Sequence, residues 1–66
     1  MKQIHVNSEQ VNCESLNLAE LLNELGYAGA IVATAVNGQF VAQTNRQQLV
    51  IKTGDQVEVL APMQGG

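Results

Sequence analysis

Apolar and polar residues alternate at the start of the chain, which is the pattern of a strand with one buried face. Residues 3–7 follow this pattern, and Ile4 and Val6 fall on the same side of the strand. A polar stretch at 7–10 is typical of a turn, and the alternation resumes at 11–13. The pattern therefore predicts a hairpin at the N-terminus, with Ile4 and Val6 in the core.

Between residues 17 and 26 the apolar spacing changes to that of a helix. Leucines recur at positions i, i+3, i+4 and i+7, so they share one helix face. They are Leu18, Leu21, Leu22 and Leu25. Asn17 can cap the first turn with its side chain, and Glu20 stands at the third helical position, as in a capping box. Gly26 follows where a left-handed residue often ends a helix. We predict one short helix that packs through its leucines.

A second hairpin is predicted around the pair Asn37-Gly38. Asn-Gly favours the tight type I′ turn, because both central residues need a positive φ. A near-continuous apolar run at 30–36 precedes the pair, and Phe40-Val41 supplies the returning strand. The run is apolar on both sides, so its periodicity leaves open which side faces the core.

The C-terminal part of the chain contains one further strand. Residues 42–48 are polar and irregular, and the apolar residues 49–51 fit a strand or a helical turn equally well. A turn at 52–55 leads into alternating residues at 56–61. This order of elements predicts an α+β fold, with one helix packed across one face of a mixed sheet of four to five strands. With the last strand beside the first, the arrangement resembles the β-grasp, or ubiquitin-like, fold.

Length, charge and cysteine content restrict the partners of the chain. The 66 residues make one domain, which we expect to comprise residues 1–62, followed by a flexible tail at 63–66. Six acids against three cations give a net charge of −3, so neither nucleic acid nor an anionic membrane is an expected partner. Cys13 is the single cysteine, which excludes an internal disulfide and favours a reducing, cytoplasmic location. We expect no signal peptide and no membrane span.

The sequence closes with Gly65-Gly66, behind the strand at 56–61 and a spacer at 62–64. Glycine makes up about 7% of average sequences, so such a pair arises by accident in roughly one chain in 200. A tail without Cβ atoms can enter a narrow channel, and we expect it to end in a free carboxylate. An ordinary frayed terminus is the alternative.

The order of elements and the glycine tail together resemble the ubiquitin-like sulfur carriers of bacteria and, within that group, the ThiS family of thiamine thiazole biosynthesis. The residues that carry the resemblance are spread over nearly the whole chain. They lie at 18–22, 36–38, 54–59 and 61–66. The last two segments, at this spacing, are the specific ones. One departure lies at 42–46, where the family has Pro and often Arg after the fourth strand, with an aromatic residue soon after.

The resemblance implies a protein that enzymes act on and that is not itself an enzyme. A ubiquitin-activating-like adenylyltransferase would use ATP and Mg²⁺ to attach AMP to the Gly66 carboxylate. Sulfur from a donor such as a cysteine desulfurase would then replace the AMP, and thiazole synthase would take the sulfur from the resulting thiocarboxylate. Met63, Gln64 and Gly65 would thread the enzyme's channel. The chain itself is expected to bind no cofactor.

His5 and Cys13 have side chains that could serve in catalysis or bind a metal. A metal site needs more ligands than these two, and a Cys-His pair needs a third orienting group and a pocket. We therefore predict no metal site. Cys13 is expected to be structural, and His5 to lie exposed on the strand face opposite Ile4 and Val6.

A partner must also recognise the folded domain. Leu60 lies on the side of the last strand away from its valines, and a type I′ hairpin places Ala35 opposite Phe40. One register of the 30–36 run then gathers an exposed apolar patch, which we predict to be the docking surface for the adenylating enzyme and thiazole synthase. The patch comprises Ala33, Ala35, Phe40 and Leu60. The opposite register would bury Ile31, Ala33 and Ala35 instead.

The same fold and tail are compatible with other functions. One is the small-subunit sulfur carrier of molybdopterin synthase, and another is a ubiquitin-like modifier whose Gly66 forms isopeptide bonds with lysines. An interaction domain with an inert tail is a third. The short length and the spacer at 62–64 favour the carrier for thiazole synthesis.

Overall fold

The structure, a computed structural model, describes residues 1–27 and 29–61. In chain order the elements are β1 (Lys2–Val6), β2 (Glu9–Cys13), α1 (Leu18–Glu24), β3 (Ala33–Val36), β4 (Gln39–Val41), a 3-10 helix (Gln43–Asn45) and β5 (Gln56–Leu60). The order of strands and helix that the hydrophobic pattern predicts is confirmed. The 3-10 helix lies in the stretch that the pattern describes only as polar and irregular.

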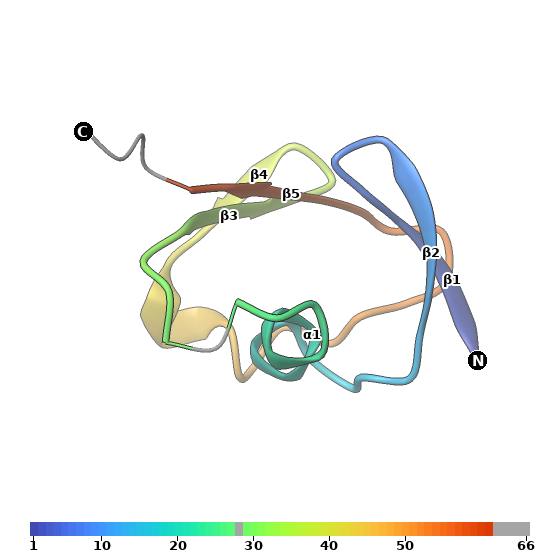
Figure 1. Ribbon diagram of the computed structural model, residues 1–66, viewed down its shortest axis with the longest axis horizontal. Coiled ribbons are helices and arrows are strands. Elements are labelled where there is room, and N and C mark those ends of the chain that lie inside the picture. The colour runs from blue at the N-terminus through green and yellow to red at the C-terminus, as the bar shows by residue number, and fades with distance from the viewer. Residues whose placement is uncertain (28, 62–66) are drawn as a thin grey trace.

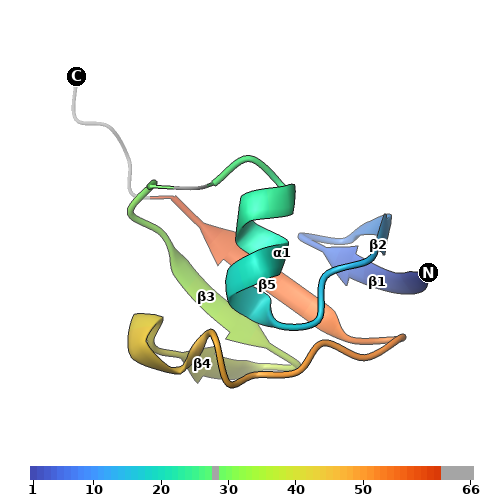
Figure 2. The same cartoon turned by 90° about the horizontal axis from the view of Figure 1, so that it is seen from below.

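The five strands form one mixed sheet in the order β2-β1-β5-β3-β4. β5 runs parallel to β1 and antiparallel to β3, so the last strand lies in the centre, between the two hairpins. The helix α1 packs across one face of this sheet, over β5, with β1 and β3 on either side (Figures 1 and 2). This is the β-grasp arrangement that the order of elements predicts.

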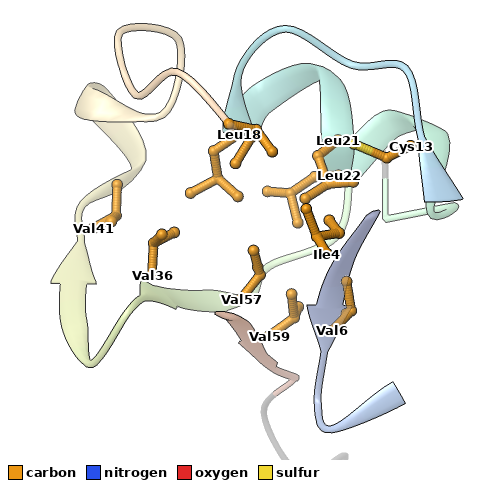
Figure 3. Close-up of a cluster of buried hydrophobic side chains, with 11 residues drawn as sticks. Ile4, Val6, Cys13, Leu18, Leu21, Leu22, Val36, Val41, Val57 and Val59 are labelled. Carbon is orange, nitrogen blue, oxygen red and sulfur yellow. The ribbon is translucent and has the colours of Figure 1, made fainter. Parts of the chain in front are cut away.

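The core lies between α1 and the inner face of the sheet. Its buried apolar side chains come from all five strands, from α1 and from the segment before β5. They are Ile4, Val6, Cys13, Leu18, Leu21, Leu22, Val36, Val41, Ile51, Val57 and Val59. Figure 3 shows the valines of β3, β4 and β5 on the side of the sheet that faces the leucines of α1. The predicted inward positions of β1 and β5 are therefore confirmed, and three of the four predicted helix leucines are buried, while Leu25 is partly buried against the core.

The helix begins and ends with the caps that the sequence predicts. The Asn17 side-chain oxygen accepts a hydrogen bond from the Glu20 N–H at 2.9 Å. The Glu20 carboxylate reaches back to the backbone N–H of the residue before the cap, one position earlier than in a standard capping box. Gly26 has a φ of +91°, and the next N–H, of Tyr27, donates to the Leu22 carbonyl at 2.8 Å. This is a Schellman ending, which uses carbonyls that the helix leaves free.

Both hairpins close with two residues in the left-handed region. Asn37 and Gly38 have φ values of 52° and 83°, as the type I′ prediction requires. Asn7 and Ser8 have φ values of 50° and 72°, so the first turn is tighter than the expected span of 7–10. Asparagine adopts a positive φ more readily than most residues, and it occupies the first position of both turns.

The strand expected over 30–36 is shorter than predicted and begins at Ala33. The reason lies in its partner, because β5 ends at Leu60, which pairs with Ala33. Gly29 still has a φ of +78°, and the Ala30 N–H donates to a carbonyl three residues earlier, so the chain is still turning there. Apolar character alone did not reveal where the pairing begins.

The apolar residues 49–51, which the pattern leaves unassigned, form one isolated bridge. Val50 pairs with Asn17, directly before α1. The Ile51 N–H donates to the Leu16 carbonyl at 3.0 Å, and the Ile51 side chain is buried in the core. The segment thus ties the start of the helix to the turn that precedes β5.

Candidate functional site

The residues predicted to form the docking surface share the outer face of the sheet, away from α1. Ala33 lies opposite Leu60 across β3 and β5, and Ala35 lies opposite Phe40 across β3 and β4. The side chains of Phe40 and Leu60 are 74% and 68% exposed, although both are large and apolar. We call these four residues the docking patch.

The register of β3 is decided by the side chains that it turns toward the helix. Thr34 and Val36 are 2% and 6% exposed, so the alternate residues Ala33 and Ala35 face outward. Thr34 is polar, but its hydroxyl donates to a carbonyl oxygen of β4 at 2.8 Å, which compensates its burial. The register that would bury Ile31 is wrong, because that side chain is 83% exposed.

The Asn7 side chain holds β5 at Val59, the residue before Leu60 of the docking patch. β1 pairs with β5 only as far as Val57, to whose carbonyl the Asn7 N–H donates at 2.9 Å. The Asn7 side chain continues the pairing in place of a further strand residue. Its amide nitrogen donates to the Val59 carbonyl at 3.1 Å, and its oxygen accepts from the Val59 N–H at 3.0 Å. The backbone next to Leu60 is therefore fixed from the β1 side.

Asn37 likewise holds the backbone of β5, at Gln56, where the strand begins. Its backbone N–H donates to the Gln56 carbonyl at 2.7 Å, and its side-chain oxygen accepts from the Gln56 N–H at 2.9 Å. Its amide nitrogen donates to the Asp55 carboxylate at 3.0 Å. Each hairpin thus uses the asparagine of its turn to hold the central strand. The sequence predicts the second turn, but neither side-chain bond to β5 could be found without the strand order.

Arg46 lies in the segment 42–46 that departs from the family pattern, and its side chain contacts the start of β3. Its guanidinium donates to the Val32 carbonyl at 2.6 Å and to the Thr34 hydroxyl at 3.1 Å. One contact reaches the residue before β3 and the other a buried side chain on the inner face of β3, so Arg46 supports the strand that carries half of the docking patch. Sequence reasoning missed this role, because a single arginine in a polar run carries no periodic signal.

The predicted reactive end of the chain lies outside the described residues. This applies to Gly66, to the three residues Met63, Gln64 and Gly65 expected to thread a channel, and to the expected boundary between residues 62 and 63. The described path ends at the exposed Ala61, directly after the strand that bears Leu60. A partner that receives this end of the chain would therefore approach beside the docking patch.

The other candidate residues, His5 and Cys13, lie apart from the docking patch. Cys13 is 1% exposed and packs in the core, as a structural residue should. His5 is exposed on β1, opposite the buried face of Ile4 and Val6, as predicted. Among residues 1–27 and 29–61, no group of three possible metal ligands occurs. No helix in the same ranges is long and apolar enough to span a membrane.

A model of the ThiS family matches residues 1–66. The chain belongs to the ThiS family. Among curated proteins, none matches the chain. Membership of this family supports the sulfur-carrier role that the sequence resemblance implies.

Solved structures of a ThiS protein have the same fold. The crystal structure of the thiamine biosynthesis protein ThiS from Geobacter metallireducens is 32% identical, with a TM-score of 0.81, and the match covers 97% of this chain and 99% of that one. A solution NMR structure of a thiamine biosynthesis protein from the same organism is 31% identical, with a TM-score of 0.80 and coverage of 97% and 87%. The β-grasp fold of the chain is thus a property that it shares with ThiS proteins.

Proposed function

We propose that this ThiS-family protein carries sulfur as a thiocarboxylate on Gly66 and donates it to thiazole synthesis for thiamine. The observation that carries the proposal is the family match over residues 1–66, in a sequence that closes with Gly65-Gly66. The structure adds an exposed apolar patch beside the strand that leads to this end. The chain acts as a co-substrate, and the chemistry is performed by its partners.

The chemistry needs an activated carboxyl group, because a free carboxylate is a poor electrophile. An adenylating enzyme similar to ubiquitin-activating proteins would let the Gly66 carboxylate attack the α-phosphorus of ATP, with Mg²⁺ held by the enzyme and pyrophosphate leaving. A sulfur nucleophile, supplied by a cysteine desulfurase or a similar donor, then displaces AMP from the acyl-adenylate. Thiazole synthase receives the sulfur from the thiocarboxylate. These partners make a cytoplasmic location the expected one.

The docking patch is proposed to bind the adenylating enzyme and thiazole synthase in turn. Aromatic residues concentrate binding energy at interfaces, and Phe40 is one of two aromatics in the chain. Leu60 lies on the strand that leads to the reactive end, so an enzyme that takes in that end must cover it. Ordering two glycines on binding has an entropic cost, which contacts with the folded domain would offset.

The intact mass of the protein after incubation with the adenylating enzyme, ATP and a sulfur source tests the proposal. Exchange of one oxygen for one sulfur adds about 16 Da to the chain, a covalent change confined to the C-terminal residue. Fragmentation of the product should place the added mass on Gly66. A ubiquitin-like modifier would instead form an isopeptide bond with loss of water, and an inert domain would stay unchanged in mass.

Two variants of the C-terminus provide the control. Deleting Gly66, or adding one residue after it, moves the carboxylate away from its position and should abolish adenylation. Circular dichroism should show an unchanged fold in both, because the substituted site lies beyond β5. If the extended chain were adenylated and thiolated without prior proteolysis, the reactive group would have to lie elsewhere.

A further inference from the structure

Glu58 brings a charge into the docking patch. It lies in the middle of β5, two residues before Leu60, and its side chain is exposed on the same face. Across the sheet it lies directly opposite Ala35, which in turn lies opposite Phe40. On its other side it borders a groove that is lined by His5, Asn7, Ser8 and Gln56. The carboxylate therefore stands where the apolar patch meets a polar groove.

Two of the three cations of the chain, Lys2 and Arg46, are hydrogen-bonded to groups other than Glu58. The Lys2 ammonium donates to the Ser15 carbonyl at 3.0 Å, and Arg46 donates to the Val32 carbonyl and the Thr34 hydroxyl. Lys52 is exposed in the segment before β5, where it lines a hollow together with Phe40 and Asp55. Within the described residues, the contacts of Lys2 and Arg46 do not involve Glu58, and Lys52 does not line the groove that Glu58 borders.

A partner that covers Phe40 and Leu60 must also remove water from Glu58. An ionised carboxylate that loses its water without gaining a counter-charge is strongly unfavourable. A partner that covers the docking patch would therefore bind best if it supplied a positive charge to Glu58. Glu14, in the loop before α1, is an exposed acid outside the patch and needs no such partner.

We propose that the adenylating partner places an arginine or lysine side chain over Glu58 when it binds the docking patch. This inference rests on the proposed function and adds to it the chemistry of the partner's surface. The cation fits at the border between the docking patch and the groove. There it contacts Glu58, while apolar side chains of the partner contact Phe40 and Leu60. Such a charge pair fixes the orientation of the bound domain and accelerates encounter with a protein of net charge −3.

The test is the affinity of the adenylating enzyme for wild-type protein and for Glu58→Gln, measured at low and at high ionic strength. Glutamine keeps the shape of the side chain and removes the charge. At low ionic strength Glu58→Gln should bind about tenfold more weakly or worse, and its affinity should depend less on salt than that of the wild type. Glu58→Lys should bind more weakly still, because it opposes the partner's cation.

Glu14→Gln is the matched control, because it changes the net charge by the same amount away from the patch. It should bind like the wild type, and an equal loss of affinity in Glu14→Gln and Glu58→Gln would overturn the specific pair in favour of a general charge effect. Normal binding by Glu58→Gln, together with lost binding by Leu60→Glu, would also overturn it while leaving the docking patch in place. If Glu58→Gln and Leu60→Glu both bind normally, the adenylating enzyme does not bind at the docking patch. Melting temperatures of all variants show that each comparison concerns folded protein.

Discussion

Both faces of β5 carry apolar side chains, but those on one face are buried and the one on the other face is exposed. Val57 and Val59 are 1% and 4% exposed against the helix, whereas the neighbouring Leu60 is 68% exposed on the other face. Folding explains the valines, because burying each side chain stabilises the domain by roughly 1.5–3 kcal/mol. It does not explain Leu60, which gains little by being apolar in the isolated domain. A single exposed leucine is common, but Phe40 lies exposed on the same face, and in the proposed function a partner protein covers both side chains.

The largest effect is expected from a charged residue on the inner face of β5. Val59→Glu should unfold the domain, because the carboxylate would lie among leucines without a partner. A chain of this length has a total stability on the order of 3–10 kcal/mol, and the penalty for a buried charge is of the same size. Far-UV circular dichroism should show a largely disordered chain at 25 °C. A cooperative urea transition close to that of the wild type would mean that Val59 is not part of the core.

The same substitution on the outer face should have the opposite result. Leu60→Glu and Phe40→Glu leave the core untouched, so melting temperatures should stay within about 5 °C of the wild type. The Michaelis constant for adenylation should rise by about tenfold or more, because the charge replaces a contact that the enzyme covers. Kinetics and thermal melts on the same samples check both statements. Unfolding of either variant, or normal kinetics in a folded one, would contradict the assignment of this face to docking.

The sequence was most informative where periodicity and turn chemistry act locally. The helix at Leu18–Glu24, its caps and the turn at Asn37-Gly38 follow from the spacing of leucines and from the φ preferences of asparagine and glycine. The alternation in β5 correctly separates its buried valines from Leu60. These features depend on residues within a few positions of one another, so a short stretch of sequence is enough to predict them.

The rest depended on contacts between distant segments. The 30–36 run is apolar on both sides, and only its pairing with β5 shows that Thr34 is buried while Ile31 is exposed. Residues 49–51 were ambiguous for the same reason, since their bridge partner Asn17 lies far away in sequence. The bonds from Asn7 to Val59 span 52 positions. No local pattern can reveal such a contact before the strand order is known.

A smaller effect on stability is expected at Asn7, whose side chain bonds the backbone of the buried Val59, next to the exposed Leu60. Asn7→Gly keeps the positive φ and removes only the two side-chain hydrogen bonds to Val59, so it should lower the free energy of unfolding by about 1–2 kcal/mol. Asn7→Ala adds backbone strain and should cost roughly 1 kcal/mol more. Urea unfolding gives both values, and amide hydrogen exchange should show that the Val59 N–H loses protection in each variant. Unchanged exchange at Val59 would show that the amide of Asn7 does not hold β5.

The smallest effect on function is expected at Cys13, the inner-face residue whose side chain could itself carry sulfur. Its thiol is 1% exposed, and a thiol must be reached by its reactant before it can form a persulfide. Cys13→Ser should therefore accept sulfur at Gly66 at the wild-type rate, as seen by the same gain in intact mass. It should lose about 1–2 kcal/mol of stability, because the hydroxyl is buried in an apolar site. Cys13→Ala separates the two effects, since it removes the sulfur without adding a polar group. A folded Cys13→Ala protein that fails to accept sulfur would show that Cys13 takes part in the transfer. The inner face of the sheet would then serve function as well as stability.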